Sequence, residues 1–232
     1  MIRRILLSGI IAGLLAGAVV FALQAVTVTP LILEAEKYEA AAANQRPNSA
    51  VAAPGSNGAG SGQFGRWGLS LLANVLTGAG FGLVLAGAIA FSGREPDLKE
   101  GVLWGLAGYG IFALAPALML PPHLPGMAES DVTGRQLLWL ATAAATAVGL
   151  GLLAFARHPI GRGLGLATLA LPLILVILAK PHGDGGVGAP LPAELVAAFV
   201  SASLASLAVF WLVLGAAVSA VMNHFLKALE AP

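Results

Sequence analysis

The sequence has no cysteine and very little charge. Without cysteine it has no disulfide, no thiolate metal site and no cysteine nucleophile. Only 10% of its 232 residues are charged, whereas soluble domains carry about 25%. The formal net charge is +1, and there is no basic stripe of the kind that nucleic-acid binding requires. These shortages exclude a soluble globular enzyme and a nucleic-acid-binding protein.

Apolar residues are abundant instead, at 58% of the chain. Read with a window of about 19 residues, they fall into separate stretches, each free of Asp, Glu, Lys, Arg and His in its interior. The stretches are Ile5–Leu33, Trp67–Phe91, Val102–Leu120, Gln136–Ala156, Gly163–Ala179 and Leu195–Met222. We therefore predict an all-α fold: a polytopic transmembrane helical bundle of about six spans in a lipid bilayer, forming one integral membrane domain over residues 1–232.

The first apolar stretch follows Arg3 and Arg4, as the core of a secretory signal would. It is far longer than the roughly 7–15 apolar residues of a signal core, and no small-x-small cleavage pattern follows it. We expect it to be a retained span. Residues 42–65, rich in Ala, Gly and Ser, are expected to form a flexible linker outside the cytoplasm.

The positive charges predict the orientation of the spans. One side collects seven Lys and Arg residues, Arg3, Arg4, Arg94, Lys99, Arg157, Arg162 and Lys227, and the other collects five, Lys37, Arg46, Arg66, Arg135 and Lys180. Because the positive side faces the cytoplasm, we expect both termini to be cytoplasmic. On that side the acids Glu95, Asp97 and Glu100 are interleaved with Arg94 and Lys99, which predicts mutual neutralisation.

The outer loops contain the candidate metal ligands. Glu34, Glu36 and Glu39 follow the first span, and Glu36 and Glu39 share a face if the helix continues. His123 lies in Pro-Pro-His-Leu-Pro-Gly-Met, before Glu129 and Asp131, and His182 lies two residues before Asp184. Imidazole and carboxylate together suit Co, Ni, Zn or Cu, and the nearby Met119 and Met127 also suit copper. A solvated helix end without a ligand remains the alternative for the glutamates.

The predicted spans contain glycines and neutral polar residues. Gly9, Gly13 and Gly17 form a small-xxx-small ridge, which predicts close helix packing, contact with a partner subunit or homo-oligomerisation. The hydroxyls and amides, among them Thr27, Asn74, Thr142, Thr146 and Ser206, either bond within the helices or offer oxygen ligands to a polar substrate. Pro30, Pro116 and Pro172 each interrupt a predicted span. Trp211 lies in the middle of a span, where we expect its side chain to pack against neighbouring helices.

No residue constellation for catalysis is evident, because the serines of the spans lack a nearby base and no carboxylate pair is buried. We therefore expect no enzymatic activity and no permanently bound cofactor. The absence of a Walker sequence means that the chain does not itself hydrolyse ATP.

Four segments in this order resemble one known family. They are TPLILEAEKYE from Thr29 to Glu39, LKEGVLWGLAGYGIFALAPALMLPPHLPGM from Leu98 to Met127, RQLLWLATAAATAVGLGLLAF from Arg135 to Phe155, and LPAELVAAFVSASLASLAVFWLVLG from Leu191 to Gly215. The chain resembles the CbtA family of predicted cobalt transporter subunits, whose members look like multi-pass proteins of the bacterial inner membrane. The resemblance implies Co²⁺ as the transported substrate, a small one-span histidine-bearing partner, CbtB, and a link to cobalamin biosynthesis.

The sequence departs from that family at one place. Members often have a histidine in the fifth span, as Leu-Pro-His, but here the corresponding residues are Leu171, Pro172 and Leu173, and the nearest histidine is His182. On this basis Glu34, Glu36, Glu39, His123 and His182 are the predicted metal-binding residues. The alternative function is a non-transporting scaffold or accessory subunit that packs into a larger membrane complex.

Overall fold

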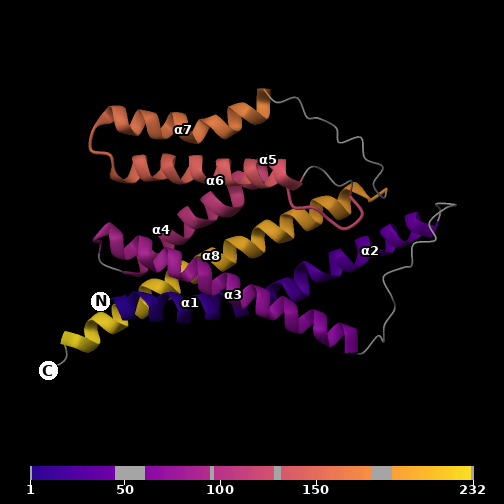
Figure 1. Ribbon diagram of the computed structural model, residues 1–232, viewed down its shortest axis with the longest axis horizontal. Coiled ribbons are helices and arrows are strands. Elements are labelled where there is room, and N and C mark those ends of the chain that lie inside the picture. Colours follow the sequence, from indigo (N-terminus) through magenta and orange to yellow (C-terminus); the bar gives the residue numbers. More distant parts are fainter. Residues whose placement is uncertain (1, 45–60, 95–96, 128–131, 179–189, 231–232) are drawn as a thin grey trace. The chain divides into compact units, whose positions relative to one another are not determined.

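The regular structure of the chain is helical. The computed structural model describes residues 2–44, 61–94, 97–127, 132–178 and 190–230, and these contain no strand. The elements are α1 (Ile2–Thr27), α2 (Thr29–Asn44), α3 (Ser61–Ser92), α4 (Leu98–Tyr109), the π-helix η1 (Gly110–Leu114), α5 (Ala115–Met119), α6 (Val132–Phe155), α7 (Pro159–Leu178) and α8 (Ala193–Glu230) (Figure 1). The predicted all-α class is confirmed.

Five helical segments within the described residues are long and apolar enough to cross a membrane. They are Ile2–Thr27, Gly65–Ser92, Leu98–Met119, Val132–Phe155 and Ala193–Phe225. Each overlaps one of the predicted spans, so the chain is a multi-pass membrane protein. The predicted fifth span, Gly163–Ala179, falls largely on α7, which is not among these five, and a sixth crossing and the orientation stay predictions.

The first span ends earlier than the apolar pattern indicates. We expected it to continue to Leu33, but α1 ends at Thr27, Val28 forms a turn and α2 begins at Thr29. The Val28 N–H still donates to the Gln24 carbonyl at 2.9 Å. Pro30 explains the break, because proline lacks an N–H and its ring is tolerated only in the first turn of a helix. Hydropathy alone does not register this, since Pro30 lies within an apolar run.

The chain divides into two compact units by its backbone contacts. Unit 1 comprises Met1–Pro30, Ala40–Leu106 and Ala205–Pro232, and unit 2 comprises Leu31–Glu39 and Ala107–Leu204. Of the predicted linker, residues 42–44 belong to α2 and residues 61–65 to α3, while residues 45–60 lie outside the described part of the chain.

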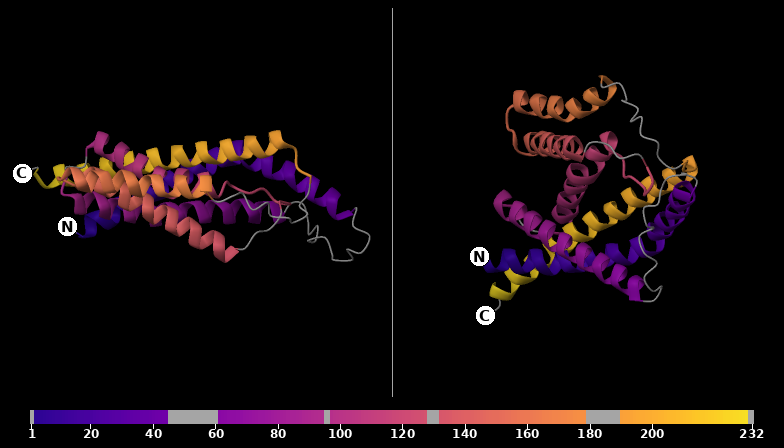
Figure 2. Two further views of the ribbon diagram at one scale, coloured as in Figure 1. Left: turned by 90° about the horizontal axis from the view of Figure 1, so that it is seen from above. Right: turned by 45° about the vertical axis from the view of Figure 1, so that its right-hand side comes forward.

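In unit 1 the glycine ridge of α1 packs on α3, and Figure 2 shows the two helices crossing. A Cβ atom added to Gly9 would lie 2.8 Å from the carbonyl oxygen of Gly82. One added to Gly13 would overlap the backbone of Gly78, and one added to Gly17 would lie 2.5 Å from the carbonyl oxygen of Asn74. Only residues without a side chain allow this approach, so the ridge serves packing inside the chain.

A second glycine contact in unit 1 joins α4 to α8. A Cβ atom on Gly101 would lie 2.5 Å from the Gly215 carbonyl oxygen, and one on Gly105 would overlap the Trp211 carbonyl. The indole of Trp211 is 2% exposed and lies 4.9 Å from the ring of Phe81, between centroids. The predicted packing role of Trp211 is confirmed.

In unit 2, α6 packs against α7, η1 and α5, and α5 also contacts α7. Gly149 makes the α6–α7 approach possible, because a Cβ atom there would lie 3.0 Å from the Gly165 carbonyl oxygen. Pro172 is buried inside α7, and the helix continues through it. The third span is different: α4 gives way to the π-helix η1 directly before Pro116, which occupies the first turn of α5.

Candidate metal-binding residues

The three glutamates predicted on the outer face lie on α2, which is continuous from Thr29 to Asn44. Glu36 and Glu39 are therefore one helical turn apart on the same face, as predicted if the helix continued. Glu34 is already engaged, since the Lys37 Nζ donates to its Oε2 at 2.6 Å. This hydrogen bond and the negative charge of Glu34 raise the pKa of Lys37 above its ordinary value of 10.5. The lysine thus stays charged at neutral pH and neutralises one of the three carboxylates.

His123 lies in the loop after α5, and its Nε2 atom is 3.0 Å from the Nη1 atom of Arg135 near the start of α6. A guanidinium has donors only, so the imidazole accepts this hydrogen bond with its Nε2 lone pair and has its own proton on Nδ1. The loop is anchored by Leu124, which is 3% exposed. A metal ion could bind Nε2 only after displacing Arg135.

Four more residues considered as ligands on the predicted outer face lie outside the described part of the chain. They are His182, Glu129, Asp131 and Asp184. Among the residues that the structure describes, no group of three His, Asp or Glu side chains is arranged to hold a metal ion. The metal-binding role of Glu34, Glu36, Glu39, His123 and His182 therefore stays a prediction.

The polar side chains inside the spans bond mainly to their own helices. The hydroxyls of Thr27, Thr142, Thr146 and Ser201 each donate at 2.8 Å to the carbonyl four residues earlier. The Asn74 amide does the same, to Ser70 O at 2.9 Å. Internal bonding, one of the two alternatives for these groups, is thus observed. Each hydroxyl oxygen has lone pairs left once its proton is donated.

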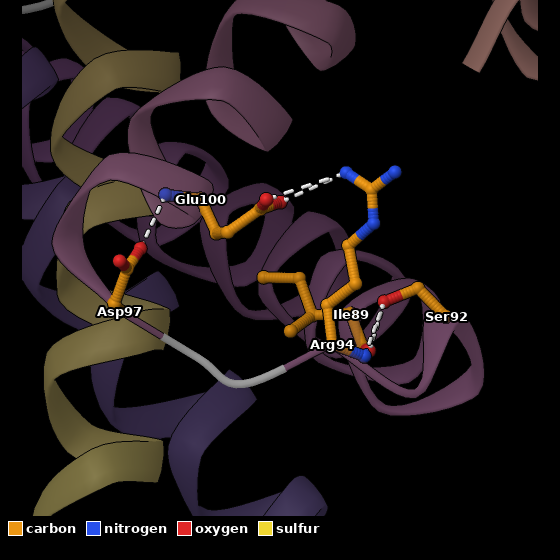
Figure 3. Close-up of polar contacts among 5 residues, drawn as sticks. All are labelled: Ile89, Ser92, Arg94, Asp97 and Glu100. Carbon is orange, nitrogen blue, oxygen red and sulfur yellow. Dashed lines mark hydrogen bonds and ion pairs between the residues drawn. The ribbon is translucent and has the colours of Figure 1, made fainter.

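The turn between α3 and α4 shows charges that neutralise one another (Figure 3). Arg94 Nη1 lies 3.3 Å from Glu100 Oε1, and the Asp97 Oδ1 accepts a hydrogen bond from the Glu100 N–H at 2.7 Å. Asp97 therefore caps α4, and Gly93, at φ 67°, supplies the left-handed conformation that ends α3. The predicted neutralisation is confirmed for Arg94 and Glu100, and these acids serve the fold.

Sequence reasoning missed the contact between His123 and Arg135 and the π-helix of the third span. The first joins residues twelve positions apart, across a loop whose path no spacing rule gives. The π-helix had a partial signal in the sequence, because Pro116 was expected to interrupt its span and Gly110 precedes it in the same apolar stretch. Nothing in hydropathy distinguishes a π-helix from a kink.

The comparisons with known proteins add one positive finding. A search of curated proteins and a search of solved structures each found no match. The model of the CbtA family, described as a probable cobalt transporter subunit, matches residues 2–223. That match covers nearly all of the 232 residues. It includes the five membrane-spanning candidates except for the last two residues of the fifth. The family is a class of transporter subunits rather than of enzymes. The chain belongs to the CbtA family of probable cobalt transporter subunits.

Proposed function

We propose that this protein is the membrane subunit through which Co²⁺ enters the bacterial cytoplasm across the inner membrane. It acts with a small one-span, histidine-bearing subunit like CbtB, and the imported cobalt serves cobalamin biosynthesis. The observation that carries this proposal is the match of the CbtA family model over residues 2–223. The helices that fill the same residues supply the multi-pass architecture that transport requires.

The outer face gathers the cation in this proposal. Glu36 and Glu39 form a carboxylate pair on one face of α2, just beyond the end of the first span. A local excess of negative charge raises the concentration of a divalent cation near the membrane. His123 and His182 provide imidazole donors for a transition metal such as cobalt. Arg135 has to release His123 before the Nε2 atom can take part.

A histidine-bearing partner fits the chemistry of the spans. In the five candidate spans, every Asp, Glu, Lys, Arg and His lies near an end. The interiors therefore offer a cation only neutral ligands, namely oxygen and sulfur atoms. A proton relay through a buried carboxylate is therefore absent from the described spans. The membrane potential is a sufficient drive, since two charges moving inward across 100 mV gain about 4.6 kcal/mol.

The decisive experiment is uptake of radiolabelled Co²⁺ by cells that lack this gene and by cells that express the chain with or without the small partner. We expect uptake to depend on the chain and to rise with the partner. Glu36→Gln with Glu39→Gln should lower initial uptake, whereas Glu95→Gln with Glu230→Gln, at the predicted cytoplasmic ends, should not. Equal uptake with and without the chain would refute transport; stable stoichiometric capture of a larger complex would then favour the scaffold function.

A further inference from the structure

The end of the first span contacts α8 through two hydroxyl groups. The Oγ1 atom of Thr27, the last residue of α1, lies 3.5 Å from the Oγ atom of Ser206 on α8. Both residues belong to unit 1. Thr27 is half-buried and Ser206 is 1% exposed. The contact therefore brings together two neutral oxygen atoms from helices that are far apart in the sequence.

This contact differs from an ordinary hydrogen bond. The Thr27 hydroxyl proton is donated to the Leu23 carbonyl at 2.8 Å, so the Thr27 oxygen presents only lone pairs to Ser206. The 3.5 Å between the two oxygens exceeds the roughly 2.5–3.0 Å of O–H···O hydrogen bonds. Two oxygens that bind one small divalent cation at about 2.0–2.2 Å lie about 2.8–3.6 Å apart, for octahedral or tetrahedral coordination. The spacing thus matches two ligands of one cation better than a donor with its acceptor.

The backbone at the end of α1 adds negative potential at the same place. The last hydrogen bond of this helix runs from the Val28 N–H to the Gln24 carbonyl. The Val26 carbonyl belongs to the peptide group directly before Thr27, and its helical donor would be the nitrogen of Pro30, which has no hydrogen. Carbonyls at a helix C-terminus attract cations, and helix ends of this kind coordinate the coupling ions of several membrane transporters.

We propose that Thr27 Oγ1 and Ser206 Oγ form a transient binding site for the transported divalent cation, which occupies it after the carboxylates of α2 have gathered it. The inference rests on the proposed function, because it assumes that a divalent cation passes through this chain. Neutral oxygens suit such a site, since a conducting site must bind a cation well enough to admit it and weakly enough to release it. Water and ligands of the partner subunit complete the coordination.

The test is initial uptake of Co²⁺ by cells that express the chain with its partner, at equal amounts of membrane protein. Thr27→Val keeps the shape of the side chain and removes one oxygen, and Ser206→Ala removes the other. Since even the outer partners of metal ligands are worth about 10–100-fold in affinity or activity, each change should lower uptake by about tenfold or more. Thr27→Ser keeps the oxygen and should retain uptake.

Each variant has a matched control. Thr146→Val is the control for Thr27→Val, because the Thr146 hydroxyl also donates at 2.8 Å to its own helix, to the Thr142 carbonyl. Ser219→Ala is the control for Ser206→Ala, because Ser219 is 0% exposed on the same helix and its hydroxyl has no hydrogen-bond partner within the described residues. Neither control should lower uptake.

A thiol at the site separates coordination from packing. Because the chain has no cysteine, Ser206→Cys introduces a single sulfur atom in place of the oxygen. This variant should raise the ratio of Cd²⁺ to Co²⁺ uptake, because sulfur ligands favour softer cations. Ser219→Cys, equally buried on α8, should leave the ratio unchanged. A serine that served packing alone would not shift the ratio at either position.

The outcomes distinguish this inference from the proposed function. Chain-dependent uptake that is unchanged in Thr27→Val or Ser206→Ala, or lowered equally in the matched controls, overturns the site and leaves transport intact. An unchanged Cd²⁺ to Co²⁺ ratio in Ser206→Cys does the same. Absence of chain-dependent uptake in the wild type overturns both. If Thr27→Val or Ser206→Ala does not accumulate in the membrane, the ratio measured for Ser206→Cys decides.

Discussion

At the scale of single residues, Lys37 lies on α2 between Glu36 and Glu39, the carboxylates proposed to gather the cation. Its ammonium pairs with Glu34 at 2.6 Å on an exposed surface. Exposed pairs of this kind contribute little to stability. In the proposed function the pair would matter more for binding of the cation, because Lys37 would repel the metal ion and its ammonium already bonds to Oε2 of Glu34.

We therefore predict that Lys37→Gln raises the apparent affinity for Co²⁺ in uptake measured at low ionic strength. The pKa of Lys37 is raised, so the pair is complete below the ordinary lysine pKa of 10.5 and is lost only as pH rises through the higher folded value. Changing pH within the neutral range should leave the effect of the variant unchanged. Lys99→Gln, on the predicted cytoplasmic side, is the control, and an equal gain there would contradict this local explanation.

At the scale of elements, the contact between α1 and α3 depends on missing side chains. A Cβ atom on Gly13 would overlap the backbone of Gly78 and Ala79, whereas one on Gly87 would meet nothing within 4 Å. Backbone cannot move aside as a flexible side chain can, so the two helices would have to separate. The loss of van der Waals contacts then extends along the whole ridge.

We predict that Gly13→Ala lowers the free energy of unfolding in detergent by about 1–3 kcal/mol, the usual cost of overpacking. Gly87→Ala should be neutral or stabilising by about 0.5–1 kcal/mol, because alanine favours a helix over glycine. Helical circular dichroism during titration with denaturing detergent measures both changes. Equal stability of the two variants would show that the close approach of α1 and α3 contributes nothing to the folded state.

The elements also show what could be predicted from the sequence and what could not. Apolar runs without charge predicted the spans because hydrocarbon excludes ionisable groups from their interiors. The end of α1 was wrong by several residues, since Pro30 acts through backbone geometry and not through hydropathy. The shared face of Glu36 and Glu39, predicted for the case that the helix continued, is present on α2, because helical spacing is local. The pairing of His123 with Arg135 depends on the path of a loop, which no local pattern encodes.

At the scale of the whole molecule, the number of crossings determines on which sides the termini lie. An even number of spans puts both termini on one side, and an odd number puts them on opposite sides. Among the described residues, five helical segments are long and apolar enough to span the membrane, and α7 decides whether there is a further crossing. Because the chain has no cysteine, a single introduced thiol reports the side of any position.

We predict that Glu39→Cys reacts with a membrane-impermeant maleimide in intact cells, whereas Arg157→Cys and His224→Cys react only after permeabilisation. This result requires α7 to cross the membrane between the two protected positions. Protection of position 157 with labelling of position 224 would instead mean that α7 does not cross. Labelling of both would mean that the orientation inferred from the positive charges is wrong.

The π-helix of the third span changes which side chains of that span share a helical face. Successive residues of an α-helix are offset by about 100° around the axis, and the π-turn takes up one residue more than α-geometry allows. Everything after η1 is thus rotated by about that angle relative to everything before it. Met119, on α5 beyond η1, contacts Thr142 on α6 through its sulfur atom. The residues before and after η1 therefore follow two different helical phases within one continuous span. Removing one residue from Gly110–Leu114 would change which side chains of the second half share a face and would leave the first half unchanged.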